Sequence, residues 1–199
     1  MTALAAQIIR DPKQMAILLL QAVALPDEQV FLEPTSPKYT KVDYYRMACH
    51  LLFHCQRCGT CCATGNPIRL RPEDAAALAK HLKIPLQKAR KKYTIPDPDK
   101  PGVLDFKYTQ PCKFHDPKAL GCKIYAVRPW SCRIFPFLGI YGSEDRVLVK
   151  ESCPGSMETM RTLTAALDEV CNDPVGFASV EPEDVRRAKL LLRMALEMV

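Results

Sequence analysis

Hydrophobic residues recur at helical spacing in several stretches of the chain. Six helices are predicted, over residues 13–25, from Asp43 into the following cysteine run, from Pro72 to about Leu82, from Pro85 to about Tyr93, from Ser156 to about Cys171, and from Pro182 onward. Asp43 and Ser156 are the expected N-caps, and prolines followed by acids open two of the other helices.

Strand-like patterns are shorter and lie in the middle of the chain. Residues 103–108 alternate between apolar and polar side chains, and 68–70 form a short extended piece. Residues 135–141 and 146–150 predict a hairpin, whereas 95–102 contain three prolines and predict a loop.

These elements indicate an α+β fold with an irregular, cysteine-rich centre. A small antiparallel sheet would lie in that centre, flanked by helices from both ends of the chain. The expected parts are an N-terminal helical extension over 1–52, a cysteine-cluster domain over 53–155, and C-terminal helices over 156–199 that pack on the same domain.

Composition adds little to this prediction until the cysteines are counted. The chain has 199 residues, 48% hydrophobic and 25% charged, and a formal charge of +6, which permits an anionic partner without requiring one. Its dense basic run, 88–92, is typical of a solvated helix face. The ten cysteines, beside four histidines, require a chemical reason.

The cellular compartment decides what cysteines mean. The apolar run Met15–Leu20 follows Arg10 and Lys13, and Ala22–Ala24 resembles a cleavage site. The run is short for a signal peptide and for a membrane span, which needs about 20 apolar residues. We therefore expect a cytoplasmic, reduced protein without membrane association, and disulfides are the disfavoured alternative.

Three cysteines, Cys55, Cys58 and Cys61, form a C-x2-C-x2-C run. Thiolates at this spacing on one loop suit one iron–sulfur cube, whose fourth ligand is often remote and followed by proline. Cys153, followed by Pro154, fits that description.

Cys62 is an additional thiol directly after this run. Adjacent side chains point apart, so Cys61 and Cys62 are awkward ligands for one ion. The remaining set is Cys62, Cys112, Cys122 and Cys132. The hypothesis is two groups of four thiols, and a single centre with spare thiols is the open alternative. Cys49 is predicted to be a buried small hydrophobic residue.

Other chemistry of the same residues remains possible. Structural zinc is a strong rival to iron–sulfur. A catalytic cysteine would need a base, for which His54 and His115 are the nearby candidates. Arg57, Arg128 and Arg133 flank the ligands and could offset the negative charge of a thiolate site.

The ordered motifs resemble a known family. Cys55–Cys62, followed by Pro111–Phe114, Cys122–Tyr125 and Arg128–Pro136, is similar to the CxxCxxCC cysteine-cluster family, a zinc- or iron-chelating domain. The resemblance covers about residues 53–155 and implies metal chelation by the eight matching cysteines. Flagellin lysine N-methylases carry a similar cluster, associated with iron–sulfur, but this chain has no G-x-G loop for a nucleotide-like cofactor.

Three functions follow in order of preference. The first is a metal-binding protein with one or two 4Fe-4S clusters, or Zn²⁺, in electron transfer, metal handling or an accessory subunit, with a protein redox or client partner. The second is an iron–sulfur-dependent enzyme, redox or methylase-like, with a pocket lined by residues such as Tyr125, Arg128 and His115. The third is a zinc-dependent nucleic-acid-binding module. The sequence assigns no catalytic residue and no oligomeric state.

Overall fold

The structure is a computed structural model, and it divides the chain into two compact units. Unit 1 comprises residues 1–54, 136–151 and 155–199, and unit 2 comprises residues 55–135 and 152–154. The residues described are 10–24, 39–63, 68–98, 100–107, 111–119, 121–138, 146–173 and 182–197. Each unit is described by itself.

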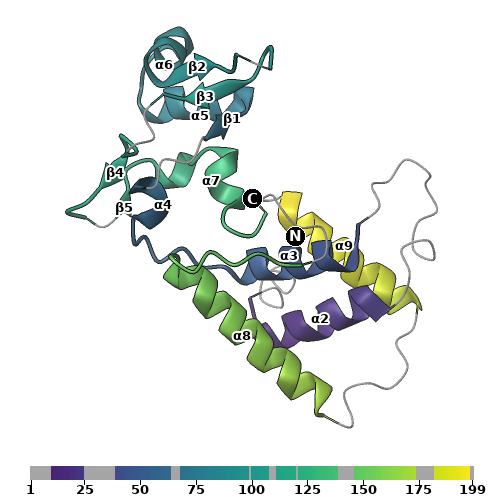
Figure 1. The fold of residues 1–199 in the computed structure, drawn as a ribbon. Coiled ribbons are helices and arrows are strands. Elements are labelled where there is room, and N and C mark those ends of the chain that lie inside the picture. The colour runs from purple at the N-terminus through teal and green to yellow at the C-terminus, as the bar shows by residue number, and fades with distance from the viewer. Residues whose placement is uncertain are drawn as a thin grey trace. The chain divides into compact units, whose positions relative to one another are not determined.

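Unit 1 is helical (Figure 1). Its helices are α2 (Pro12–Ala24), α3 (Lys41–Leu52), α8 (Pro154–Cys171) and α9 (Pro182–Glu197). α2 packs against α3 and α9, and α3 also packs against α9. The core contains fully buried side chains such as Met15, Leu19, Tyr44, Leu163 and Leu192, so the predicted helical periodicity reports real burial.

Two helix starts differ from the prediction. α3 begins with Thr40 as its N-cap, and Asp43 is the N3 residue of a capping box in which each side chain accepts from the other's backbone. Ser156 does not cap α8, which starts at Pro154; instead its buried hydroxyl donates to the carbonyl of Lys150 at 2.6 Å.

Unit 2 packs two helices with a three-stranded antiparallel sheet (Figure 1). The helices are α5 (Pro72–His81) and α6 (Leu86–Tyr93), and the strands are β1 (Arg69–Leu70), β2 (Thr94–Pro96) and β3 (Leu104–Phe106), in the order β1-β3-β2. β3 is central because both neighbours pair with it. The predicted loop over 95–102 is wrong at its start, where Ile95 pairs with Asp105.

The second part of unit 2 carries the cysteines. It consists of the short helix α4 (Thr60–Ala63), a small hairpin of β4 (His115–Asp116) and β5 (Gly121–Cys122), the 3₁₀ turn η2 (Tyr125–Val127) and α7 (Trp130–Ile134). The described residues 135–138 and 146–150 contain no strand, so the hairpin predicted there is wrong for them; 139–145 lie outside the described residues.

Aromatic residues form the core of unit 2. Tyr93, Phe106 and Phe114 are buried, and their ring centroids are 5.2–6.5 Å apart. Phe114 immediately precedes β4, so this core connects the sheet to the cysteine-bearing hairpin.

The predicted fold class is confirmed. Both units together give helices with a small antiparallel sheet, an α+β arrangement with helices toward both ends of the chain. In the parts of the chain that the structure describes, no helix combines the length and the apolar character needed to cross a bilayer.

Candidate metal centre

All eight predicted ligand cysteines lie in unit 2. The two other cysteines, Cys49 and Cys171, lie in unit 1. Cys49 is 1% exposed and packs in the core, as predicted, and burial raises the pKa of its thiol to about 12. All ten thiols are free, so the disulfide alternative gains no support. The fold thus gathers the eight thiols from separate segments into one compact unit.

The loop from Cys55 to Cys62 turns through two left-handed residues. Arg57 has φ +56° and Gly59 has φ +79°. The carbonyl of Gly59 then accepts from the backbone N–H groups of Cys62 and Ala63 at 2.9 and 3.0 Å. These bonds start α4, which carries Cys61 and Cys62 on consecutive helical positions. A bulky residue costs free energy at φ > 0, so Arg57 is a strained point in the loop.

The hairpin brings Cys112 and Cys122 to this loop. The backbone N–H of Cys112 donates to the carbonyl of Cys62 at 2.8 Å. His115, on β4, pairs in register with Cys122 on β5. A Cβ built on Gly59 would lie 2.3 Å from His115 Nε2, so the imidazole packs directly on the glycine. A larger residue at position 59 would be strained at this φ and would displace the imidazole, so glycine favours the fit between the hairpin and the cysteine loop.

Cys132 is positioned by α7, which a buried carboxylate holds in place. Asp74 Oδ2 accepts from the backbone N–H groups of Arg71 and Trp130 at 2.8 and 3.1 Å. Asp74 Oδ1 forms an ion pair of 3.5 Å with Arg133, and the Arg71 guanidinium stacks on the Trp130 ring at 3.9 Å. Arg133 thus pairs with a carboxylate of α5.

Cys61 and Cys62 form an unequal pair of thiols. The Cys62 S–H donates a hydrogen bond to Cys61, which lowers the pKa of the Cys61 thiol to about 6, and Arg128 also favours the Cys61 thiolate. The same bond raises the pKa of Cys62. At neutral pH, Cys61 is therefore a thiolate, and the protonated Cys62 donates a hydrogen bond to it. Because the thiolate is the form of cysteine that binds metal, Cys61 is in the right state to act as a ligand.

Three more thiols share this electrostatic environment. Burial raises the pKa values of Cys112 and Cys122, and it raises that of Cys132 to about 12. Each of these thiols also interacts electrostatically with Cys61. The Arg128 guanidinium favours the thiolates of Cys122 and Cys132. Five of the eight predicted ligands therefore interact electrostatically through Cys61, and three of them also interact with Arg128, across the division into two groups of four that the sequence suggested.

Cys55, Cys58 and Cys153 take part less directly. Cys58 Sγ donates to the Thr60 hydroxyl at 3.4 Å. The segment that carries Cys153 lies beside the one that carries Cys55, because a Cβ on Gly155 would come within 2.7 Å of the His54 carbonyl oxygen. The start of α8 is therefore held tightly against the residue that precedes the cysteine loop.

Two arginines flank one aromatic ring at the site. The guanidinium carbons of Arg57 and Arg128 lie 4.5 and 3.9 Å from the centroid of the Tyr125 ring. Tyr125 follows Cys122 by three residues, in η2. The ring holds two cations near the thiols by cation–π attraction, which stabilises such contacts by ~0.5–2 kcal/mol.

The donor chemistry fits a soft metal, although the side chains are not closed around an ion. Among the described residues, no three His, Cys, Asp or Glu side chains converge closely enough to hold one ion. His115 Nε2, a buried nitrogen at the cysteine loop, has no hydrogen-bond partner among the described residues. Thiols are the preferred ligands of Zn²⁺ and of iron–sulfur clusters, and the residues present fit either.

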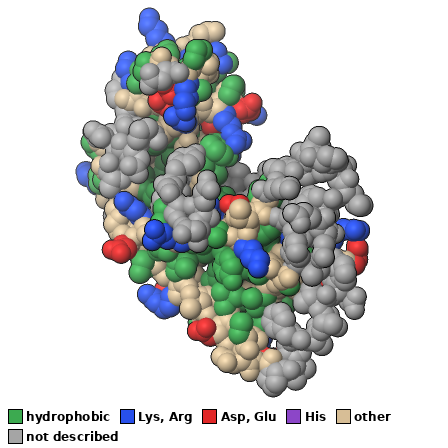
Figure 2. Space-filling model, turned by 45° about the vertical axis from the view of Figure 1, so that its right-hand side comes forward, with side chains coloured by type: hydrophobic (Ala, Val, Ile, Leu, Met, Phe, Trp, Pro, Cys, Tyr) green, Lys and Arg blue, Asp and Glu red, His purple; other side chains and the backbone are tan. Residues whose placement is uncertain are grey.

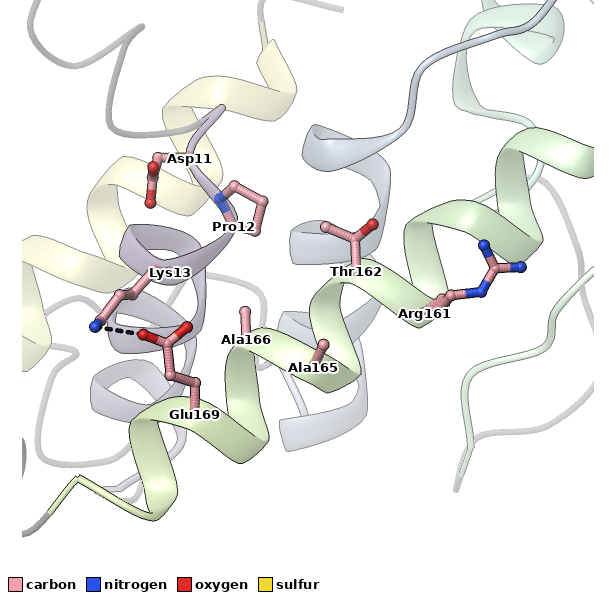
Figure 3. A pocket seen from close by; sticks show the side chains of 8 residues that line it. All are labelled: Asp11, Pro12, Lys13, Arg161, Thr162, Ala165, Ala166 and Glu169. Atoms are coloured by element: carbon pink, nitrogen blue, oxygen red, sulfur yellow. Dashed lines mark hydrogen bonds and ion pairs between the residues drawn. The ribbon is translucent and has the colours of Figure 1, made fainter.

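The groove in Figure 3 belongs to unit 1, and no cysteine is among its lining residues. It has a volume of about 470 Å³ and is lined by residues of α2, α8 and the residue before α2. Its Lys13 and Glu169 side chains pair with each other at 2.7 Å. None of Tyr125, Arg128 and His115, expected around an enzyme pocket, lines it.

Sequence reasoning missed the roles of Asp74 and Tyr125. Asp74 was visible only as a first-turn acid of a helix, and Tyr125 as part of a motif and as an expected pocket residue, not as a ring between two arginines. Each has one partner more than 50 positions away along the chain, Trp130 for Asp74 and Arg57 for Tyr125, and no local pattern reports such contacts. The aromatic residue between flanking arginines was the available signal for Tyr125.

Comparison with known proteins identifies the family. The model of the CxxCxxCC family, described as "Putative zinc- or iron-chelating domain", matches residues 54–171. An uncharacterised protein of Methanocaldococcus jannaschii, MJ0661, is 35% identical over 100 residues. That alignment covers 50% of this chain and 52% of MJ0661, so the chain spans about half the length of this relative.

No solved structure matches the chain. The family match covers more than half of the sequence and includes all eight cysteines of unit 2. This match and the gathered thiols support metal binding. The chain belongs to the CxxCxxCC family of zinc- or iron-chelating domains.

Proposed function

We propose that this protein binds one or two metal centres through the cysteines of unit 2 and serves a protein partner in electron transfer, metal handling or as an accessory subunit. The observation that carries the proposal is the grouping of eight free thiols in unit 2, five of which interact electrostatically in a cluster that includes Cys61. Thiolate ligands bind soft metals most strongly, so a compact unit with this many thiols is best suited to a soft metal.

The proposed ligands are the eight cysteines named from the sequence: Cys55, Cys58, Cys61, Cys62, Cys112, Cys122, Cys132 and Cys153. The thiols lie in short, irregular segments around α4, the hairpin and α7. Rotation of side chains in these segments would bring them onto a metal, and metal binding would then stabilise the unit as it does in small metal-binding domains.

Iron–sulfur is the favoured centre, with Zn²⁺ as the alternative. The C-x2-C-x2-C run offers three thiols to one cluster, and a remote cysteine before proline offers the fourth. The cations on Tyr125 favour a centre with net negative charge, because guanidinium groups hydrogen-bond to sulfur and tune such centres. A 4Fe-4S cluster supplies one-electron chemistry when bound.

The metal content of the purified protein tests this proposal. Protein purified without oxygen is expected to absorb broadly near 400 nm and to contain iron and acid-labile sulfide. A colourless protein with stoichiometric zinc would replace the iron–sulfur proposal with the zinc alternative. Protein without either metal would refute metal binding by unit 2.

A further inference from the structure

Charge is divided unequally between the two units. Residues 55–135 with 152–154 contain 16 Lys and Arg against 6 Asp and Glu, a formal charge of +10. The rest of the chain contains 12 against 16, a formal charge of −4. The net charge of +6 therefore hides a strongly basic unit. Four-thiolate centres with a net charge of about −2 each would leave unit 2 positive.

The lysines of α6 are a part of this charge without counter-ions. Lys88, Lys91 and Lys92 are exposed and lie three and four residues apart, where like charges repel. No acidic side chain in the described residues forms an ion pair with any of them, and Asp97 and Asp116 pair with Arg69 and Lys123 instead. The negative C-terminal end of the α6 dipole stabilises Lys91 and Lys92 in the last turn, but Lys88 lies outside that turn and is not stabilised in this way.

Lysines from other segments join this helix around one residue. Lys92 and Lys113 place their ammonium nitrogens 5.3 and 5.6 Å from the centroid of the Tyr93 ring. The backbone N–H of Lys107 donates to the Tyr93 carbonyl at 2.8 Å, and its side chain is exposed. Lys92 and Lys113 therefore contact the Tyr93 ring, and Lys107 is joined to Tyr93 through its backbone. We call the surface formed by Lys88, Lys91, Lys92, Lys107 and Lys113 the lysine surface.

The lysine surface adjoins the cysteines. Lys113 directly follows Cys112, and the ring of the next residue, Phe114, packs on Tyr93 at 5.2 Å between centroids. Figure 2 shows several Lys and Arg side chains, with hydrophobic and a few acidic side chains between them, on the end of unit 2 that carries α6 and the three-stranded sheet. A partner on this surface would lie near the hairpin of Cys112 and Cys122.

The surface fits a protein better than a nucleic acid. Two large apolar side chains, Leu86 and Ile95, are 36% and 45% exposed at the two ends of α6, and such residues are useful in protein interfaces. Tyr93 is 6% exposed and offers no ring for base stacking. The cations are lysines, whereas base edges and phosphates are read most specifically by the fork of arginine.

We propose that the lysine surface binds an acidic segment of a partner protein and positions that partner beside the Cys112–Cys122 hairpin. The binding itself depends only on charge and shape. Its role depends on the proposed function, because delivery of electrons or metal to a nearby centre is the reason to dock there. Electrostatic attraction of this kind acts mainly on the association rate and falls with added salt.

The test uses the 199-residue chain, purified without oxygen, and a fluorescent polyglutamate 20-mer as the probe. In the triple variant Lys88→Glu, Lys91→Glu, Lys92→Glu, affinity should fall about tenfold or more at low salt. The matched control is Arg10→Glu, Lys41→Glu, Arg187→Glu, which changes the same charge at exposed positions of unit 1. The control should retain most of the affinity. The variant Lys88→Gln, Lys91→Gln, Lys92→Gln should lose affinity without placing acids at the end of α6.

Three results would overturn the proposal. Equal losses in the charge-reversal variant and the control would show attraction by net charge alone. Tighter binding of a single- or double-stranded DNA 20-mer than of polyglutamate would assign the surface to nucleic acid. Unchanged polyglutamate binding in a folded glutamine variant would show that the lysine surface does not bind the acidic probe. Metal content, measured on each sample, reports on the proposed function separately, because a metal-free protein that still binds polyglutamate through these lysines refutes only the metal centre.

Discussion

The backbone N–H of Cys112 donates a hydrogen bond of 2.8 Å to the carbonyl oxygen of Cys62. This bond joins the cysteine loop to the hairpin, two segments 50 residues apart in sequence. It holds the backbones of the two cysteines close together. The predictions below test this arrangement at its contacts.

Gly59 should be essential to the junction. Gly59→Ala places a Cβ 2.3 Å from His115 Nε2 at φ +79°, so it combines backbone strain of ~1–2 kcal/mol with overpacking of ~1–3 kcal/mol. Gly102→Ala is the matched control, because Gly102 has φ +84° and nothing within 4 Å. Urea unfolding should show a clearly larger loss for Gly59→Ala, together with reduced metal content. Equal losses would mean that the packing on His115 is unimportant.

Gly155→Ala should destabilise the protein although it adds a better helix former to α8. The added Cβ would lie 2.7 Å from the His54 carbonyl oxygen, a backbone atom that cannot rotate away. We expect a loss of ~1–3 kcal/mol against a helix-propensity gain of ~1 kcal/mol. Gly121→Ala, whose nearest contact would be 3.7 Å, serves as the control. A stabilised Gly155→Ala protein would contradict the close contact.

Cys61 should be the most reactive thiol of the metal-free protein at neutral pH. Its thiolate is stabilised by the Cys62 S–H, which lowers the pKa of Cys61 to about 6. Iodoacetamide labelling followed by peptide mass spectrometry should therefore show Cys61 modified with a midpoint near pH 6. Cys62→Ala removes the donor and should move that midpoint toward higher pH.

Cys62→Ser is a second test of the hydrogen bond from Cys62 to Cys61. A serine hydroxyl can still donate to the Cys61 thiolate, so the midpoint should stay lower than in Cys62→Ala. If alanine and serine at position 62 give the same midpoint, the Cys61–Cys62 hydrogen bond does not control the reactivity of Cys61.

Asp74→Ala should loosen α7 and with it Cys132. The substitution removes the acceptor of two backbone N–H groups and the partner of Arg133, and Asp74 is 5% exposed. Hydrogen bonds to a charged acceptor contribute ~1.5–3 kcal/mol each, so losing two of them should lower the free energy of unfolding by ~3 kcal/mol or more. Glu73→Ala, an exposed acid in the same helical turn, should cost much less.

The sequence predicted what local chemistry controls. Prolines at Pro72 and Pro182 correctly marked helix starts, because a missing N–H costs nothing there. Asp43 was misplaced because Thr40, three residues earlier, supplies the reciprocal bond. Residues 135–141 look like a strand because they are apolar, but the described part is a buried turn in which Phe137 packs on Phe53.

The sequence singled out the cysteines of the candidate site more readily than the residues that support them. Spacing singled out the eight cysteines because thiol chemistry is local to each motif; their role as ligands remains a prediction. The positive φ of Arg57, the hub at Asp74 and the ring of lysines around Tyr93 depend on tertiary contacts. Net charge also concealed the basic character of unit 2, because the remainder of the chain is acidic.

The central claim is that the cysteines of unit 2 bind metal, and metal analysis of protein purified without oxygen tests it most directly. The account predicts stoichiometric iron with acid-labile sulfide, or zinc in the alternative, that is lost when Cys61 and Cys132 are replaced by serine and retained when Cys49 and Cys171 are replaced. Wild-type protein that is folded, has ten free thiols and contains no metal would contradict it.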